Sequence, residues 1–313
     1  MDTVATTQDL SPAGPRPGGG TPSTRRLGSK LEMLPLVAPA VGLLLIWMIV
    51  PLAMTLWFSF RRYNLLNPML HGWAGGSNYM FLFRDPALYS ALIVTVFLVG
   101  GVLIVTVALG AIFAALFAND FPGQGVARVL MISPFFVMPT VSALIWKNLL
   151  MNPVNGLISY ILRSVGLRAV DWFGQFPLGS VIAIVSWEWL PFAFLIMFTS
   201  IQSLDGSTLE AARLDGAGPI SIFRYIQIPH MGRAISVVVM METIFLLGIF
   251  AEIYVTTAGG PGTATTNLAF LIYQRALLAF NVGSASAAGV IAIVLANIMA
   301  AFLINTVARR LDV

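Results

Sequence analysis

Four residues in long apolar runs have side chains suited to recognising a solute rich in hydroxyl groups. They are Trp187, Glu188, Glu242 and Asn297. Sugars and sugar alcohols offer C–H faces that pack on aromatic rings, and hydroxyl groups that hydrogen-bond to carboxylates and amides. If the runs cross a membrane, each carboxylate costs about 2.5–3.5 kcal/mol on insertion scales, so Glu188 and Glu242 need a reason to be there. The alternative is that these side chains pair with other helices or with a partner chain.

Other chemistries find no support in the sequence. The chain has no cysteine, which excludes disulfides, cysteine-ligated zinc and thiol catalysis. His71 and His230 are too far apart to suggest a metal site. The stretch Gly259–Thr266 lacks the lysine of a phosphate-binding loop, so we expect a tight external turn there. We find neither an acid–base carboxylate pair nor a nucleophile triad, and we expect no enzyme activity, metal or cofactor in this chain.

The composition points to a membrane protein. Of the 313 residues, 58% are hydrophobic and 10% are charged. Soluble domains are about 25% charged, so the bilayer is the expected solvent for the excess apolar surface. The net charge of +4 is small and dispersed, which favours membrane orientation over nucleic-acid binding. Because lipid offers the backbone no hydrogen-bond partner, we expect the apolar runs to be helices and the fold to be all-α.

Six apolar runs are long enough to span a bilayer, which predicts a polytopic protein with six transmembrane helices. The expected spans are residues 34–60, 88–117, 126–149, 179–203, 234–257 and 284–308. We expect a soft break in the second span at Gly100 and Gly101. Six spans place both termini on one side, and that side has ten Lys and Arg residues against seven opposite. This bias predicts that both termini are cytoplasmic.

The N-terminal region differs in composition from the rest. Residues 1–30 are rich in Pro, Gly, Ser and Thr, carry positive charges and contain no apolar run. This composition predicts a disordered cytoplasmic tail rather than a signal peptide. We expect residues 31–313 to form one transmembrane domain.

The segment Leu204–Met231 is a polar island between two expected spans. Its charged residues and histidine are Asp205, Glu210, Arg213, Asp215, Arg224 and His230. Asp205, Ser207 or Thr208 is expected to cap a first helix. We place Glu210 in the first turn, near the positive end of the helix dipole.

Glycines and prolines divide this segment further. Gly216 and Gly218 are expected to end the first helix. Pro219 then begins a second helix over Ile220–Gln227, and Pro229 directs the chain toward the next span. The pattern predicts two short helices around a glycine turn, with small side chains that let another protein pack closely.

The spacing in this segment resembles the EAA loop of ABC-importer permeases. Glu210-Ala211-Ala212 is followed after three residues by Gly216, and nine residues later by Ile226-Gln227-Ile228-Pro229. The family has leucine where this chain has Ile228, a change that keeps the apolar character. The resemblance implies the type I ABC-importer permease fold and a segment, 204–231, that couples to a cytoplasmic ATPase. The coupling residues it implies are Glu210, Ala211, Ala212, Asp215, Gly216, Ile226, Ile228 and Pro229.

A second stretch is similar to carbohydrate-type permeases. Glu252–Pro261, which reads EIYVTTAGGP, looks like the external loop of maltose, glycerol-phosphate and polyol permease subunits. Thr263–Val282 most resembles sorbitol and mannitol permeases. The resemblance covers roughly residues 35–310 and implies a sugar or sugar alcohol (polyol) as cargo.

The resemblance also implies partners and a location. A second homologous permease would form a heterodimer with this chain, a dimer of ABC ATPases would use the ATP, and an extracytoplasmic binding protein would deliver the solute. The location implied is the bacterial inner membrane. A competing hypothesis is an ion- or proton-coupled secondary carrier without an ATPase, with Glu188 and Glu242 as proton sites. A permease of the same fold for amino acids, peptides or metals is a third hypothesis, and the Gly-Gly-Pro stretch argues against it by resemblance alone.

Overall fold

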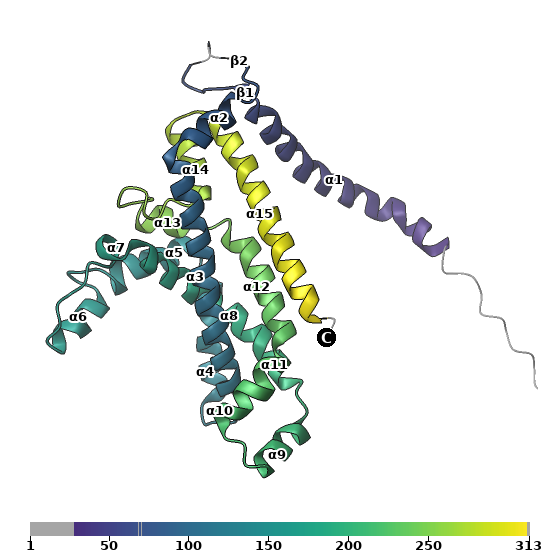
Figure 1. Ribbon diagram of the computed structural model, residues 1–313, viewed down its shortest axis with the longest axis vertical. Coiled ribbons are helices and arrows are strands. Elements are labelled where there is room, and N and C mark those ends of the chain that lie inside the picture. Colours follow the sequence, from purple (N-terminus) through teal and green to yellow (C-terminus); the bar gives the residue numbers. More distant parts are fainter. Residues whose placement is uncertain (1–27, 68, 70, 312–313) are drawn as a thin grey trace, which may run out of the picture. The chain divides into compact units, whose positions relative to one another are not determined.

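The computed structural model describes residues 28–311 except 68 and 70, and most of these residues are helical (Figure 1). The chain divides into two compact units after Leu52, within the first helix. The first helix begins at Gly28, so the last residues of the expected N-terminal tail are helical. Residues 1–27 of that tail lie outside the described part of the chain.

Turns and loops join the elements of the first two thirds of the chain. These elements are α1 (Gly28–Ser59), β1 (Arg61–Arg62), β2 (Gly72–Trp73), α2 (Ser77–Arg84), α3 (Pro86–Phe117), α4 (Gln124–Ile132), η1 (Ser133–Phe136), α5 (Pro139–Leu144), η2 (Ile145–Leu150), α6 (Leu157–Ser164), α7 (Trp172–Gln175) and α8 (Pro177–Gln202). The polar segment follows. The remaining elements are α9 (Gly206–Leu214), α10 (Pro219–Ile222), η3 (Phe223–Gln227), α11 (Ile228–His230), α12 (Gly232–Leu246), α13 (Ala251–Thr256), α14 (Leu268–Tyr273), η4 (Gln274–Leu278) and α15 (Val282–Leu311).

Among the described residues, four helices are long and apolar enough to cross a membrane, and there are six spans if each of two bent helix pairs is one. The four are Val37–Ser59 of α1, α3, α8 and Val282–Met299 of α15. The predicted all-α fold is confirmed, with only the short antiparallel pair β1 and β2 added, and six spans are consistent with the structure. α3 runs unbroken through Gly100 and Gly101, where the sequence predicts a soft break. A continuous helix keeps every backbone group paired in lipid.

The third expected span, residues 126–149, is sharply bent. The helical run Gln124–Phe136 and the run Pro139–Leu150 are bent by 101° relative to one another. Met138, which precedes Pro139, is extended, with φ of −61° and ψ of 136°. The proline ring disfavours a helical conformation in the residue before it, so the chain changes direction there.

The fifth expected span, residues 234–257, is interrupted as well. α12 ends at Leu246, and the helical pattern lapses before α13 begins. α12 is preceded by the helical run Pro219–His230, which is bent by 63° relative to it. The carbonyl of Ile249, in the break, accepts a hydrogen bond from Asn267 Nδ2 at 2.6 Å. Asn267 is fully buried, and it satisfies a backbone group that lipid would leave unpaired.

Helices α3 and α8 pack closely against one another and form the centre of the second unit. Gly110 of α3 allows this approach, because a Cβ added there would lie 3.0 Å from Ala193 Cβ. Beyond Gly110, Phe117 meets Phe194 edge to face with ring centroids 5.2 Å apart. Helix α12 packs against both α3 and α8, so three helices share this core.

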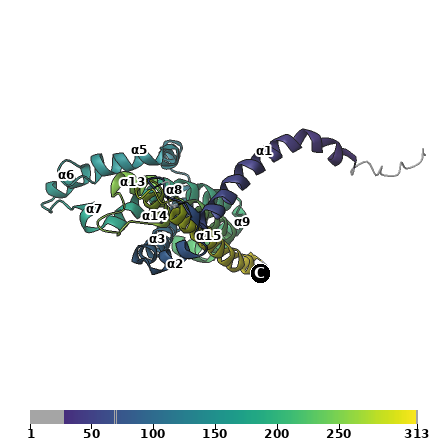
Figure 2. The same cartoon turned by 90° about the horizontal axis from the view of Figure 1, so that it is seen from above.

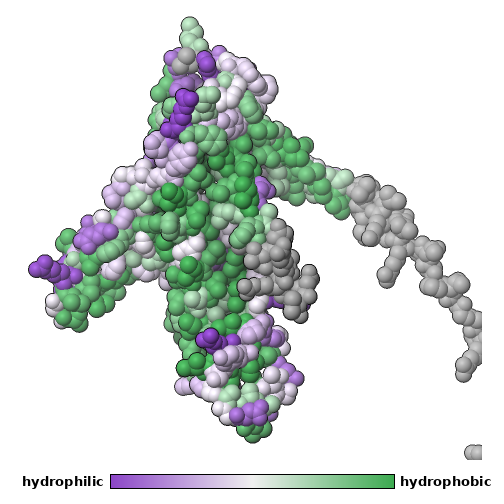
Figure 3. All heavy atoms as spheres, viewed as in Figure 1, coloured by the Kyte–Doolittle hydropathy of each residue, from purple (hydrophilic) through white to green (hydrophobic). Residues whose placement is uncertain are grey.

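Polar and apolar residues occupy different parts of the second unit. In Figure 2, α5, α6 and α7 lie to one side of it. In Figure 3, hydrophobic residues cover its middle, and hydrophilic residues gather at the end that carries α9 and α10. The polar segment therefore lies beyond the apolar zone of its unit.

We expect Gly110→Leu to lower the free energy of unfolding by about 1–3 kcal/mol, because the added side chain must push α3 away from α8. Gly100→Leu in the same helix is the matched control, since a Cβ at Gly100 meets nothing within 4 Å. Thermal unfolding of the full chain in detergent measures both variants. Equal midpoints for the two would contradict the close α3–α8 contact.

Candidate functional site

The first half of the polar segment forms α9, and an aspartate caps it. Asp205 is the N-cap, and its side chain accepts a hydrogen bond from Ser207 N at 3.0 Å, which confirms one of the three predicted caps. Because α9 begins at Gly206, Glu210 lies in the second turn, which corrects its predicted place in the first. The dipole effect is strongest in the first turn, so it does not explain this glutamate.

A glycine turn closes α9. Gly216 has φ of +82°, a conformation that side chains other than glycine rarely adopt. Its N–H donates to Arg213 O, and the N–H of Ala217 donates to Ala212 O at 2.9 Å. These bonds satisfy the last carbonyls of α9 and fix the direction in which the chain leaves it.

The second half of the segment is one helical run formed by α10, η3 and α11. Pro229 lies inside this run, so the sequence prediction that it directs the chain out of the helix is wrong. It is the second residue of α11, and the chain stays helical through it. The chain turns instead at Met231, whose side chain is fully buried.

Much of the segment is exposed, including large apolar side chains. The exposed fractions are 89% for Leu214, 80% for Ile220 and 72% for Tyr225. Of the residues expected in coupling, six are exposed and two are partly buried. The exposed ones are Glu210, Ala211, Asp215, Gly216, Ile228 and Pro229, and the partly buried ones are Ala212 and Ile226. An apolar surface of this kind beside charged groups is typical of a protein-binding site.

His230 ties the end of the segment back to its beginning. Its Nε2 lies 2.9 Å from Ser200 O and 3.1 Å from Ser203 Oγ. A carbonyl oxygen only accepts, so Nε2 carries the proton and donates to it. Ser200 belongs to the last turn of α8. The histidine therefore links α11 to α8 by adding a donor to a carbonyl that already accepts from Ser203 N at 3.1 Å and from Ser203 Oγ at 2.7 Å.

Glu242 has a partner on a neighbouring helix. The Thr106 hydroxyl of α3 donates to Glu242 Oε2 at 2.6 Å, and both residues are fully buried. This contact supports the alternative interpretation, in which the carboxyl group of Glu242 pairs with a neighbouring helix. Its second oxygen, Oε1, has no hydrogen-bond partner among the described residues.

Glu188 of α8 lies near polar groups of two other elements. It is 6% exposed, and its carboxyl group faces Ser142 of α5 and Glu252 of α13. Its Oε1 has no hydrogen-bond partner among the described residues. A buried carboxyl group in this state has capacity for a further hydrogen bond, for example with a solute hydroxyl.

The other two expected path residues lie in different surroundings. The Trp187 ring meets Trp146 edge to face, with centroids 5.8 Å apart, and both side chains are partly buried. Asn297 is exposed on α15, and its amide donates to Ile293 O of the same helix at 2.8 Å. The structure thus gives Glu188, Glu242 and Asn297 separate partners rather than one shared site.

An aromatic cluster that the sequence analysis did not select lies where the two bent spans meet α8. The Trp189 ring is 5.2 Å from Phe245 of α12 and 6.0 Å from Phe135 of η1, and Phe192 packs beside both Trp189 and Phe135. Phe135 and Phe245 remain about half exposed. Trp189 and Phe192 are three residues apart on α8, a spacing that places them on one face. That spacing could have indicated the Trp189 and Phe192 part of the cluster from the sequence. The place of Phe135 of η1 depends on the proline bend and could not.

Comparison with known families identifies the chain. Residues 106–313 match the family described as binding-protein-dependent transport system inner membrane component. A probable ABC transporter permease of Sinorhizobium fredii is 32% identical, covering 80% of this chain and 81% of that protein. The trehalose/maltose transport system permease of Thermococcus litoralis is 31% identical, covering 80% and 85%. The chain therefore belongs to this family of ABC-importer permeases.

A solved structure has the same fold. A bacterial ABC transporter that imports the acidic polysaccharide alginate contains a chain with a TM-score of 0.75 and 21% identity. The match covers 91% of this chain and 99% of that one. The permease fold implied by the sequence resemblance is thus shown over nearly the whole chain.

We expect His230→Ala to raise amide hydrogen exchange in residues 203–231 by about fivefold, because a link worth about 1 kcal/mol is lost. His71→Ala is the control, since His71 stacks on Tyr63 in a different part of the chain. Exchange followed by mass spectrometry on the full-length protein measures both. Unchanged exchange in His230→Ala would show that the histidine does not hold the segment.

Proposed function

We propose that this family member is the permease subunit through which an ATP-driven importer moves a sugar or sugar alcohol across a bacterial inner membrane. The observation that carries the proposal is the exposed segment 204–231, with its Glu-Ala-Ala and glycine spacing on a capped helix. The relatives support the cargo class. One is a trehalose/maltose permease, and a glycerol-3-phosphate permease of Agrobacterium fabrum is 29% identical over 88% of this chain.

The segment is proposed to dock on a partner ATPase. Its expected contact residues are Glu210, Ala211, Ala212, Asp215, Gly216, Ile226, Ile228 and Pro229. The small residues let α9 approach a partner closely, and exposed Leu214 supplies apolar surface to bury. The Gly216 turn keeps α9 at a fixed angle to the run that follows it. A pull on α9 is then passed on as a rigid-body movement rather than absorbed locally.

The proposed orientation has this segment and both termini in the cytoplasm. The excess of Lys and Arg on that side of the chain supports it. Residues 1–30 would be a cytoplasmic tail and residues 31–313 the transmembrane domain. A second permease, an ATPase dimer and an extracytoplasmic binding protein complete the proposed importer, and ATP is used by the ATPase rather than by this chain.

The aromatic cluster on α8 is the proposed place of solute passage. The half-exposed rings of Phe135 and Phe245 and the partly buried ring of Trp189 suit the C–H faces of a sugar. Glu188 and Trp187 precede Trp189 on the same helix, and the carboxyl group of Glu188 has an oxygen free for a hydroxyl group. Glu242 and Asn297 remain predictions for the path, without contacts that join them to this cluster.

Reconstituted vesicles test the proposal against the secondary-carrier hypothesis, which family membership does not favour. Uptake of labelled sugars or polyols should require the ATPase, internal ATP and the binding protein. Uptake by this chain alone, driven by a proton gradient, would overturn the importer proposal.

We expect Gly216→Asp to reduce co-purification of the ATPase by about tenfold, because a side chain at positive φ costs about 1–2 kcal/mol and reorients α9. The chain itself should still insert, since a Cβ at Gly216 meets nothing within 4 Å. Gly218→Asp is the matched control. It adds the same charge at a φ of −74°, which any residue adopts. Equal retention of the ATPase by both variants would remove the turn from the docking proposal.

We expect Glu188→Ala to weaken solute uptake by about tenfold or more, since a hydrogen bond to a charged group contributes about 1.5–3 kcal/mol. Glu188→Gln should retain part of the uptake, because an amide still bonds a hydroxyl group. Co-purification of the partners serves as the assembly check. Normal uptake by Glu188→Ala in an intact complex would take Glu188 out of the path.

A further inference from the structure

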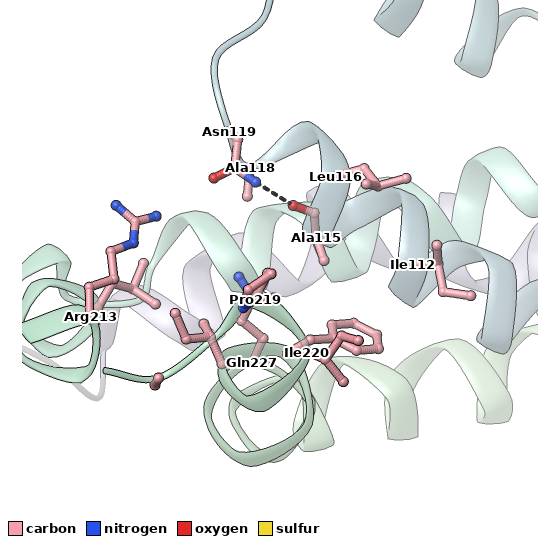
Figure 4. Close-up of a pocket in the computed structure, with 13 residues that line it drawn as sticks. Ile112, Ala115, Leu116, Ala118, Asn119, Arg213, Pro219, Ile220 and Gln227 are labelled. Atoms are coloured by element: carbon pink, nitrogen blue, oxygen red, sulfur yellow. Dashed lines mark hydrogen bonds between the residues drawn. The ribbon is translucent and has the colours of Figure 1, made fainter. Parts of the chain in front are cut away.

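A pocket of about 500 Å³ lies between the end of α3 and the polar segment (Figure 4). On one side it is lined by Ile112, Leu116 and Asn119, and on the other by Arg213 and Ile220. Its volume is within the range of small-ligand sites, about 300–1,000 Å³. The pocket joins a membrane-spanning helix to a segment outside the apolar zone.

The lining of this pocket is apolar at the α3 side and cationic at the rim. Arg213 is the only charged residue in the lining, and it forms no ion pair within the described part of the chain. The Asn119 amide donates to Ala115 O at 3.3 Å and keeps its carbonyl toward the same rim. No acidic side chain lines the pocket, so its charge favours an anion.

An exposed apolar stripe on α3 leads into the pocket. It consists of Ile104, Ala108, Ile112 and Leu116 at a spacing of four residues. Ile104 is 72% exposed and Leu116 is 57% exposed, so the stripe faces outward from its unit. From first to last it covers about 18 Å, close to the roughly 15 Å hydrocarbon depth of one leaflet. The stripe therefore has the length and polarity of a surface that a lipid acyl chain covers.

We propose that this pocket holds one anionic phospholipid, with an acyl chain along the α3 stripe and the phosphate at Arg213. The apolar floor continues into the membrane span, which a soluble anion would leave exposed to water. Ile112 lies inside the apolar span Pro86–Phe117, so a water-soluble protein partner would have to reach into the apolar zone to cover it. The bound lipid would place α9 relative to α3, and this role lies beyond the proposed transport function.

Native mass spectrometry of the importer, purified in detergent with its partners, tests the site. The probes are dioleoylphosphatidylglycerol and the zwitterionic dioleoylphosphatidylcholine. We expect retention of one phosphatidylglycerol per copy of this chain in preference to phosphatidylcholine. Arg213→Gln should lower retention about fivefold, which corresponds to about 1 kcal/mol for one cation near an anionic lipid.

Matched variants separate head-group recognition from general binding. Arg213→Lys should keep the preference, because it keeps the charge, whereas Ile220→Glu should lose it by repelling the phosphate. Arg224→Gln removes a cation of the same segment that lies outside the pocket and over the Tyr225 ring, and it should retain the lipid. Retention does not depend on transport, so it is readable even if the proposed cargo is wrong.

Three results would overturn the proposal. The first is unchanged phosphatidylglycerol retention in Arg213→Gln. The second is equal retention of the two lipids, which would mean that an acyl chain binds without head-group recognition. The third is an efficient disulfide cross-link from Leu116→Cys to the second permease, which would mean that a protein covers the stripe.

Discussion

The requirement that every backbone polar group finds a partner inside the chain governs this structure. Lipid supplies no donor or acceptor, and each unpaired group there costs several kcal/mol. α3 meets the requirement as an unbroken helix, and α8 does so apart from Pro191, which has no N–H to donate. The Gly110–Ala193 contact lets them approach closely, so their attraction comes from packing rather than from expulsion of water. They form the rigid part of the second unit, against which the other spans are placed.

The interrupted fifth span, residues 234–257, departs from this rule, and side chains compensate for it locally. The break after α12 leaves Ile249 O free, and the buried Asn267 amide fills it. The Lys147 ammonium does the same near the end of α13, where it donates to Val255 O at 2.8 Å. These compensations permit irregular backbone at the depth where α8 carries Glu188 and Trp189. Irregular backbone within a membrane protein is tolerated only where protein or a polar cavity surrounds it, which fits a place of solute passage.

The sequence predicts the features that depend on local pattern. Apolar run length located the spans, and the Asp205 cap and Gly216 turn followed from residue types with known backbone preferences. The sequence does not predict the features that depend on contacts between residues far apart in the chain. Nothing near Glu242 indicates Thr106, which lies 136 positions earlier in the chain. The bend at Met138 and the break after Leu246 were missed for a related reason. Hydropathy is averaged over a window of residues. The bend depends on a single proline next to Met138, and the break depends on Asn267, which lies 18 residues after Ile249.

Helix α8 connects the polar segment to the aromatic cluster. Under the proposed coupling, this connection determines which parts of the permease would move. His230 binds Ser200 at the end of α8, and Glu188 lies twelve residues earlier, about 18 Å along the helix. Over that length α8 is close-packed against α3, and close-packed interiors transmit displacement rather than absorb it. The bent spans have fewer continuous backbone bonds, so under the proposed coupling we expect them to deform before α8 does. Phe135 and Phe245 belong to those spans, whereas Trp189 belongs to α8. Under the proposed docking to an ATPase, a pull on the segment would therefore change the spacing of these rings without the segment itself touching the solute.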